Sequence, residues 1–174
     1  MDGTYKALRC AFEKKQALKY QNSINIKVAA ILRSIGSKDC LITAESLENT
    51  KGRSDMLNLR NLDLTSSDVI TIANTLAELS SENKNAIRST SFSYNYLLGD
   101  LGAIALAKAL PYSISEIGLV NCGIGDSGGR ELLKWAKNAE HLRMLCIEQN
   151  DFSENLKMEF RNFSNSQSKI LVVV

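Results

Sequence analysis

Apolar residues recur in one fixed pattern along the C-terminal two-thirds of the chain. In the clearest segment they occupy the first, fourth, sixth and eleventh positions of a frame that begins at Ile114 and ends at Ile124. Similar frames begin at residues 59, 87 and 142, so neighbouring frames are 28, 27 and 28 residues apart. A fifth frame is expected at residue 170, where Ile170 and Val173 occupy the first and fourth positions. A period this regular predicts a stack of similar structural units.

The frame has the spacing of the leucine-rich repeat, L-x-x-L-x-L-x-x-N/C-x-L, in which a short strand is followed by a helix. Strands are expected at 62–64, 90–92, 117–119 and 145–147, with a closing strand at 170–174. Helices are expected at 68–79, 99–110, 126–137 and 154–160. Because each helix carries the chain back to the start of the next strand, the strands are expected to be parallel.

The ninth position of the frame lies where the chain turns away from its strand. Asn95 and Asn150 hold it in two repeats, and an asparagine side chain there can bond the backbone groups that the turn leaves without sheet partners. Cys122 is the usual small substitute, whereas Ser67 fits less well in the repeat that begins at residue 59. The second repeat carries one extra residue after Asn95, which predicts a bulge at 94–98.

Two segments narrow the type of repeat. Residues 98–102 and 124–128 share the sequence Leu/Ile-Gly-Asp-x-Gly, which resembles the ribonuclease-inhibitor-like subfamily of leucine-rich repeats. The resemblance covers residues 57–174, and it implies a short horseshoe with a parallel concave sheet and convex helices. Proteins of this kind include inhibitors, a GTPase activator, actin regulators, immune sensors, centrosomal and ciliary proteins and bacterial effectors.

Residues 1–56 precede the repeats and form a separate region. The apolar spacing predicts helices at 3–20 and 24–35, with Gly36 ending the second helix. These helices are expected to cover the apolar end of the first repeat, and a docking helix for a partner is the alternative. Leu41 and Ile42 suggest a short edge strand, and residues 45–55 have the composition of a solvated loop.

The bulk composition limits the classes of function. The chain has 174 residues, a net charge of +2 and 44% hydrophobic residues, which suits a single soluble solenoid. The near-neutral charge argues against a nucleic-acid or membrane-surface role, and the N-terminus lacks the apolar core of a secretory signal. We therefore expect a cytoplasmic protein. The apolar end of the chain, 169–174, is expected to mark either a truncated repeat array or an edge strand that associates with a second copy.

Catalytic, metal and cofactor chemistry finds little support. The four cysteines contain no C-x-x-C pair, and His141 is the single histidine, so neither a zinc site nor a catalytic dyad is expected. The glycines at 123–129 lack the lysine of a phosphate-binding loop, and tight packing explains them better. Trp135 is expected to pack between neighbouring helices. We predict no enzyme, metal site or cofactor.

The concave strand face is the candidate partner site. Arginine recurs at the second frame position in Arg60, Arg88 and Arg143, and arginine and tyrosine often dominate interface energies. The predicted partner-binding residues are Arg60, Asp63, Arg88, Tyr94, Glu116, Arg143, Met144 and Glu148. An acidic or mixed-charge helix or tail is the expected ligand.

A protein-interaction scaffold or adaptor, with a cytoskeletal, centrosomal or ciliary role, is the predicted function. The alternatives are a bacterial effector or an immune-type recognition fragment. A GTPase-activating domain is disfavoured, because activators of this fold carry more repeats and an acidic tail.

Overall fold

The computed structural model describes residues 23–50, 55–79, 87–167 and 169–174. They fall into two units, one ending at Ser54 and the other beginning at Asp55, and each is described by itself. The helix predicted at 3–20 lies outside the described residues. Whether the first unit caps the repeats stays a prediction.

The first unit contains α2 (Ile24–Ile35), which confirms the helix expected at 24–35. The Ser23 side chain accepts a hydrogen bond from the Ile26 amide at the start of this helix. Gly36 ends it with a φ of 78°, a left-handed conformation that glycine adopts without the steric cost of a Cβ.

The second helix of this unit, α3 (Lys38–Asn49), replaces the strand and loop predicted there. Ser37 caps its first turn by accepting from the Cys40 amide. Cys40, Ala44 and Leu47 then fall at helical spacing and are buried, while Leu41 and Ile42 are exposed. The edge strand predicted at Leu41 and Ile42 was wrong because the buried residues here recur at helical spacing, and these two apolar residues lie on the exposed side of the helix.

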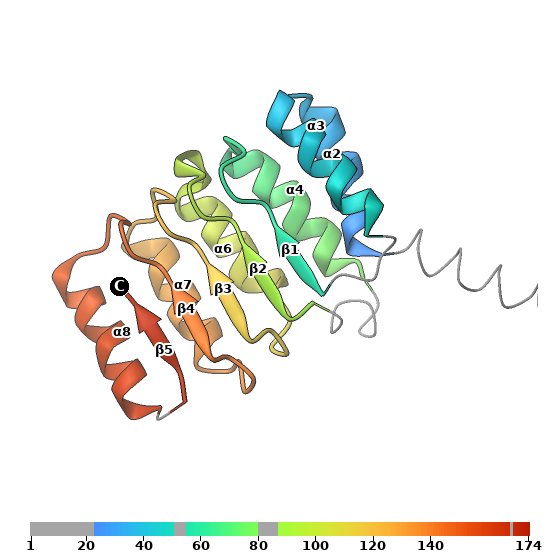
Figure 1. Ribbon diagram of the computed structural model, residues 1–174. Coiled ribbons are helices and arrows are strands. Elements are labelled where there is room, and N and C mark those ends of the chain that lie inside the picture. Colours follow the sequence, from blue (N-terminus) through green and yellow to red (C-terminus); the bar gives the residue numbers. More distant parts are fainter. Residues whose placement is uncertain (1–22, 51–54, 80–86, 168) are drawn as a thin grey trace, which may run out of the picture. The chain divides into compact units, whose positions relative to one another are not determined.

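The second unit is a single parallel sheet with helices on one face, shown in Figure 1. Its strands, in spatial and chain order, are β1 (Met56–Asn58), β2 (Ser89–Ser91), β3 (Glu116–Gly118), β4 (Met144–Cys146) and β5 (Leu171–Val173). Its helices are α4 (Ser66–Ala77), α6 (Gly99–Ala109), α7 (Asp126–Ala136) and α8 (Glu154–Ser166), with a 3₁₀ turn η1 (Tyr96–Leu98) before α6. The predicted α/β solenoid with parallel strands is confirmed.

The register of the first repeat differs from the prediction. Met56 pairs with Ser89 and Leu57 pairs with Thr90, so the first frame begins at residue 54 rather than 59 and its strand is not at 62–64. The sequence there offers leucines at 57, 59, 62 and 64, and their spacing fits either frame. At the other end of the sheet, Leu145 pairs with Val172, so the last frame begins at residue 169 rather than 170.

The remaining elements lie close to their predicted positions. Strands β2, β3 and β4 each begin one residue earlier than expected. Thr65 caps α4 through a reciprocal pair of hydrogen bonds with Asp68. Helix α8 runs six residues beyond its predicted end at residue 160, because Phe163 continues the buried stripe of Leu156 and Phe160.

The asparagine ladder is present in the repeats where it was expected. Asn95 is fully buried; its Oδ1 accepts from the amides of Leu62 and Leu64 at 3.0 Å, and its Nδ2 donates to the carbonyls of Leu59 and Phe92 at 2.8 and 2.7 Å. In the corrected register Leu62, not Ser67, holds the ninth position of the first repeat.

Asn150 repeats the arrangement two units further along the sheet. Its Oδ1 accepts from Cys122 and Ile124, and its Nδ2 donates to the carbonyls of Leu119 and Ile147. Both side chains tie the turn of their own repeat to the turn of the preceding one.

Aspartates at the helix starts provide a second link between repeats, which the sequence analysis missed. The N-cap residue of α7 is Gly125, which has no side chain to cap the helix. Asp100 of the preceding helix supplies the cap, because its Oδ1 accepts from the Gly125 and Gly128 amides at 2.8 Å. Asp126 likewise accepts from the amide and hydroxyl of Ser153, and these bonds hold the Asp126 pKa below its ordinary value.

Close helix packing explains the glycines and the tryptophan, as predicted. A Cβ on Gly128 would lie 2.8 Å from Asp100 Oδ1, and a Cβ on Gly129 would lie 2.6 Å from Leu156 Cδ2. Trp135 is buried, and its indole N–H donates to the Leu110 carbonyl.

Candidate functional site

The buried fourth frame position of strands β1 to β4 alternates with more exposed third and fifth positions, and we call the side chains at the third and fifth positions the strand face. The third positions hold Met56, Ser89, Glu116, Met144 and Leu171. The fifth positions hold Asn58, Ser91, Gly118, Cys146 and Val173. The face is therefore polar over β2 and β3 and apolar over β4 and β5.

Six of the predicted partner-binding residues lie on or beside this face. Glu116 and Met144 lie on β3 and β4 themselves. The others flank the strands: Arg88 and Arg143 directly precede β2 and β4, and Tyr94 and Glu148 lie in the turns that follow them.

Arg60 and Asp63 are displaced by the corrected register. Because the first strand ends at Asn58, Arg60 falls at the seventh position and Asp63 at the tenth, both in the turn toward α4. The arginine column is consequently shorter than predicted. Backbone hydrogen bonds place Ser115 between Arg88 and Arg143, so two of the three arginines share a column.

The turn after each strand has a left-handed residue at the eighth position. These residues are Asn61, Tyr94, Asn121 and Gln149, with φ between 51° and 64°. Recurrence in four repeats makes this conformation a property of the turn. In the second repeat the residue is an aromatic one, and the Arg60 guanidinium lies 4.4 Å from the centre of the Tyr94 ring. This cation–π contact joins two predicted site residues from neighbouring repeats.

Hydroxyl groups fill the centre of the strand face. Ser89 Oγ donates to Glu116 Oε2 at 3.2 Å, and Ser91 and Ser93 are joined through their hydroxyls at 3.3 Å. A Cβ on Gly118 would lie 3.0 Å from both of these hydroxyls, so its hydrogen side chain leaves them room.

Thiol chemistry on this face is disfavoured by electrostatics. Partial burial raises the pKa of Cys146, and the carboxylates of Glu148 and Glu116 raise it further. A thiol with a raised pKa stays protonated at neutral pH and is a poor nucleophile. Cys122 is fully buried, and burial raises its pKa to about 11.

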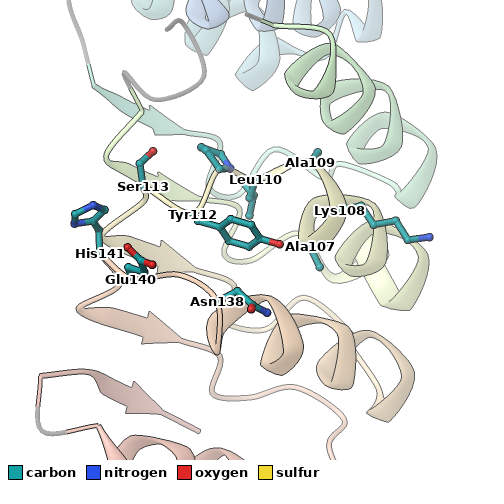
Figure 2. A pocket seen from close by; sticks show the side chains of 10 residues that line it. Ala107, Lys108, Ala109, Leu110, Tyr112, Ser113, Asn138, Glu140 and His141 are labelled. Atoms are coloured by element: carbon teal, nitrogen blue, oxygen red, sulfur yellow. The ribbon is translucent and has the colours of Figure 1, made fainter. Parts of the chain in front are cut away.

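A surface hollow of about 570 Å³ lies away from the strand face, between the α6–β3 and α7–β4 connections. Figure 2 shows its polar rim, with Lys108 near the end of α6 and His141 and Glu140 before β4. His141 is exposed, as expected for a loop residue. No hydrogen bond joins His141 to Glu140 among the described residues, so the rim holds no oriented acid–base pair.

Neither a metal-ligand cluster nor a membrane span occurs in the part of the chain that the structure describes. That part contains no group of three or more His, Cys, Asp or Glu side chains that could hold a metal ion. None of its helices has both the length and the apolar character that a membrane span requires.

The outer edge of β5 is partly occupied by a side chain of α8. The Ser164 hydroxyl donates to the Ile170 carbonyl at 2.9 Å and accepts from the Val172 amide at 3.4 Å. A second copy pairing with this edge would have to displace Ser164. Self-association through β5 stays a prediction.

Comparison with known proteins supports the fold. The sequence matches no protein-family model and no curated protein. Among solved structures, the second actin-binding site of leiomodin-1 is similar over 75% of this chain and 77% of its own length, with a TM-score of 0.57 and 18% identity. The Mex67:Mtr2 subunits of Chaetomium match over 68% of this chain and 78% of that chain, with a TM-score of 0.48 and 17% identity. The Mex67 leucine-rich-repeat domain of Chaetomium thermophilum matches over 62% and 74%, with a TM-score of 0.47 and 19% identity.

The strand pairing, the asparagine ladder and the similarity to the leiomodin-1 structure identify the fold of the second unit as a leucine-rich-repeat solenoid. At these identities the likeness concerns the fold alone.

Proposed function

We propose that this chain is a protein-interaction module whose partner binds the strand face. The observation that carries the proposal is the set of large apolar side chains exposed on that face at positions that the core does not need. They are Met56, Met144, Leu171 and Val173. Exposed apolar side chains on a rigid sheet reduce the ordering cost of binding and mark surfaces that protein partners cover.

The charges beside the face suggest what such a partner carries. Arg88 and Arg143 lie at the ends where β2 and β4 begin, and neither forms an ion pair with a described residue. Arg88 donates one hydrogen bond to the Ser113 carbonyl at 3.3 Å, which orients its guanidinium along this edge. The partner is an acidic or mixed-charge helix or tail, whose carboxylates would meet these two arginines.

A scaffold or adaptor in the cytoplasm, acting on the cytoskeleton, is the role that we propose. The similarity to an actin-binding site of leiomodin-1 supports actin as the first partner to test.

The test compares the two faces of the solenoid. The strand-face variant is Arg88→Ser, Tyr94→Ser and Arg143→Ser, and the helix-face variant is Glu131→Ser and Lys134→Ser, which removes one exposed ion pair. Cosedimentation with actin filaments and binding to actin monomers are measured first, followed by affinity purification from the source cell. The strand-face variant should weaken the partner by about 2 kcal/mol or more without lowering the melting temperature. Loss of binding in the helix-face variant alone would place the site on the helices.

A further inference from the structure

The second repeat exposes three large apolar side chains at the edge of the solenoid where the helices begin. Tyr96 and Leu97 lie in η1 and Leu101 lies in the first turn of α6, and they are 60%, 61% and 65% exposed. We call these three residues the apolar knuckle. They belong to the strand-to-helix turn and not to the strand face.

The other repeats show that the fold does not require apolar residues at these positions. The turns of the four repeats can be aligned on the buried residue at the eleventh frame position. This residue is Leu98 in the second repeat and Leu64, Ile124 and Phe152 in the others. Each of the other repeats has a single residue in the place of Tyr96 and Leu97, because the second repeat carries the insertion. These single residues are Asp63, Gly123 and Asp151. The residues that correspond to Leu101 are Ser67, Ser127 and Asn155. Three repeats therefore place small or polar residues where the second places a tyrosine and two leucines.

The inserted residue that creates the knuckle is part of the packed structure. The Leu98 amide donates to the Asn95 carbonyl, and the Gly99 amide donates to the Cys122 carbonyl of the next repeat, both at 2.9 Å. A Cβ at Gly123 would overlap the Tyr96 carbonyl oxygen, so the third repeat carries glycine where the insertion touches it. These hydrogen bonds and the close contact with Gly123 fix the backbone of the knuckle. Binding of a partner to its side chains would therefore cost little backbone entropy.

The helix starts around the knuckle are acidic, and Arg60, whose guanidinium lies over the Tyr94 ring, adds one cation in the neighbouring turn. Each α-helix of the second unit has a carboxylate in its first turn. The acidic residues along this edge are Asp63, Asp68, Asp100, Asp126, Asp151 and Glu154. Arg130 pairs with Asp126, and Lys157 and Arg161 pair with Glu154. The four other carboxylates form no ion pair with a described residue.

We propose that the apolar knuckle is a docking surface for a basic amphipathic helix of a partner protein. Such a helix presents an apolar stripe at i, i+3, i+4 and i+7, which would cover Tyr96, Leu97 and Leu101. Lysines or arginines beside the stripe would face the carboxylates of the neighbouring turns, Asp63 first among them. This surface is separate from the strand face, and the proposal does not depend on the function proposed for that face.

Synthetic peptides of about 18 residues, or five helical turns, test the proposal on the full chain. One carries a leucine stripe flanked by lysines, a second replaces the lysines with glutamates, and a third replaces the leucines with serines. Fluorescence anisotropy of the labelled peptides measures binding at low and moderate salt. The basic amphipathic peptide should bind, and the acidic peptide and the leucine-free peptide should bind at least about tenfold more weakly.

Matched variants locate the binding. Replacing Tyr96, Leu97 and Leu101 with serine should weaken the basic peptide at least about tenfold with an unchanged melting temperature. The control replaces Tyr112 and Met158, which are 55% and 57% exposed elsewhere in the unit, and should leave the affinity as it is. Asp63→Asn, which suits the left-handed φ of 53° at this position, should reduce both the affinity and its salt dependence.

Three results would overturn the proposal. The first is equal binding of the acidic and basic peptides, and the second is equal loss of affinity in the knuckle and control variants. The third is a concentration-dependent dimer in sedimentation velocity that the knuckle variant abolishes, because the knuckle would then be covered by a second copy of the chain.

Discussion

Replacing Asn95 with alanine tests the asparagine ladder most severely. The substitution removes the four hydrogen bonds that join its side chain to the backbone of two repeats. At about 0.5–1.5 kcal/mol net for each bond, the loss amounts to roughly 2–6 kcal/mol. Asn95 is fully buried, so water cannot readily replace the lost partners, and we expect about 3–5 kcal/mol.

The equivalent substitution at Asn150 is the internal comparison. Asn150 also makes four hydrogen bonds, but they are only partly buried. Water can reach some of the groups that Asn150→Ala exposes, so its cost should be smaller, about 1–3 kcal/mol. Because both asparagines make four hydrogen bonds, the difference between the two unfolding free energies measures the effect of burial alone.

Urea unfolding measures both costs. Trp135 is the single tryptophan of the chain and is buried, so its fluorescence reports on the repeats. Ser91→Ala, which removes a half-buried hydroxyl, is the control and should change stability by less than about 0.5 kcal/mol. The free energies are comparable only if all variants share one m-value. A cost below about 1 kcal/mol for Asn95→Ala, or a larger cost at Asn150 than at Asn95, would refute the reasoning.

Three further predictions concern packing and ionisation. Gly129→Ala should destabilise the chain by about 1–3 kcal/mol, because the new methyl group would lie 2.6 Å from Leu156 Cδ2; an unchanged urea midpoint would contradict the close approach of α7 and α8. The bonds from Ser153 lower the folded-state pKa of Asp126, so its stabilising effect is present above the unfolded pKa and is lost as pH falls through the folded value. Melting temperatures of the wild type and Asp126→Asn should differ at neutral pH and converge in acid, and a constant difference would exclude this link. The pKa of Cys122 is raised to about 11, so the buried neutral thiol stabilises the fold below the unfolded pKa and this effect is lost as pH rises through the folded value. Iodoacetamide at mildly alkaline pH should label this thiol only after unfolding, and rapid labelling of the native chain would show that the site opens.

The period of the apolar pattern predicted most of the fold because every repeat buries the same frame positions. Where one frame fitted, as at Ile114–Ile124, the strand, turn and helix followed to within about a residue, as expected for such boundaries. In the first repeat, leucines at 57, 59, 62 and 64 satisfied two frames. Only the pairing of β1 with β2 decides between them, and pairing depends on residues about thirty positions away.

The candidate site was predictable to the same degree as the frame. Glu116 and Met144 lie on the strand face because the frames of their repeats were predicted correctly. Arg60 and Asp63 do not, because the frame of the first repeat was placed five residues too late. The role of Asp100 was missed for a different reason. An aspartate in the first turn reads locally as a residue that favours its own helix, but its hydrogen bonds go to the helix of the next repeat.

The insertion in the second repeat shows why one edge of the solenoid can change while the rest stays in register. Before the insertion, Asn95 holds the turn to the preceding repeat. After it, Leu98 fills the eleventh core position and Asp100 caps the following helix. The extra residue is confined to the segment between Asn95 and Leu98, where the side chains of Tyr96 and Leu97 are exposed and take no part in the core. The strand face and the helix-start edge are therefore built from different frame positions, and one chain can present two surfaces of different chemistry.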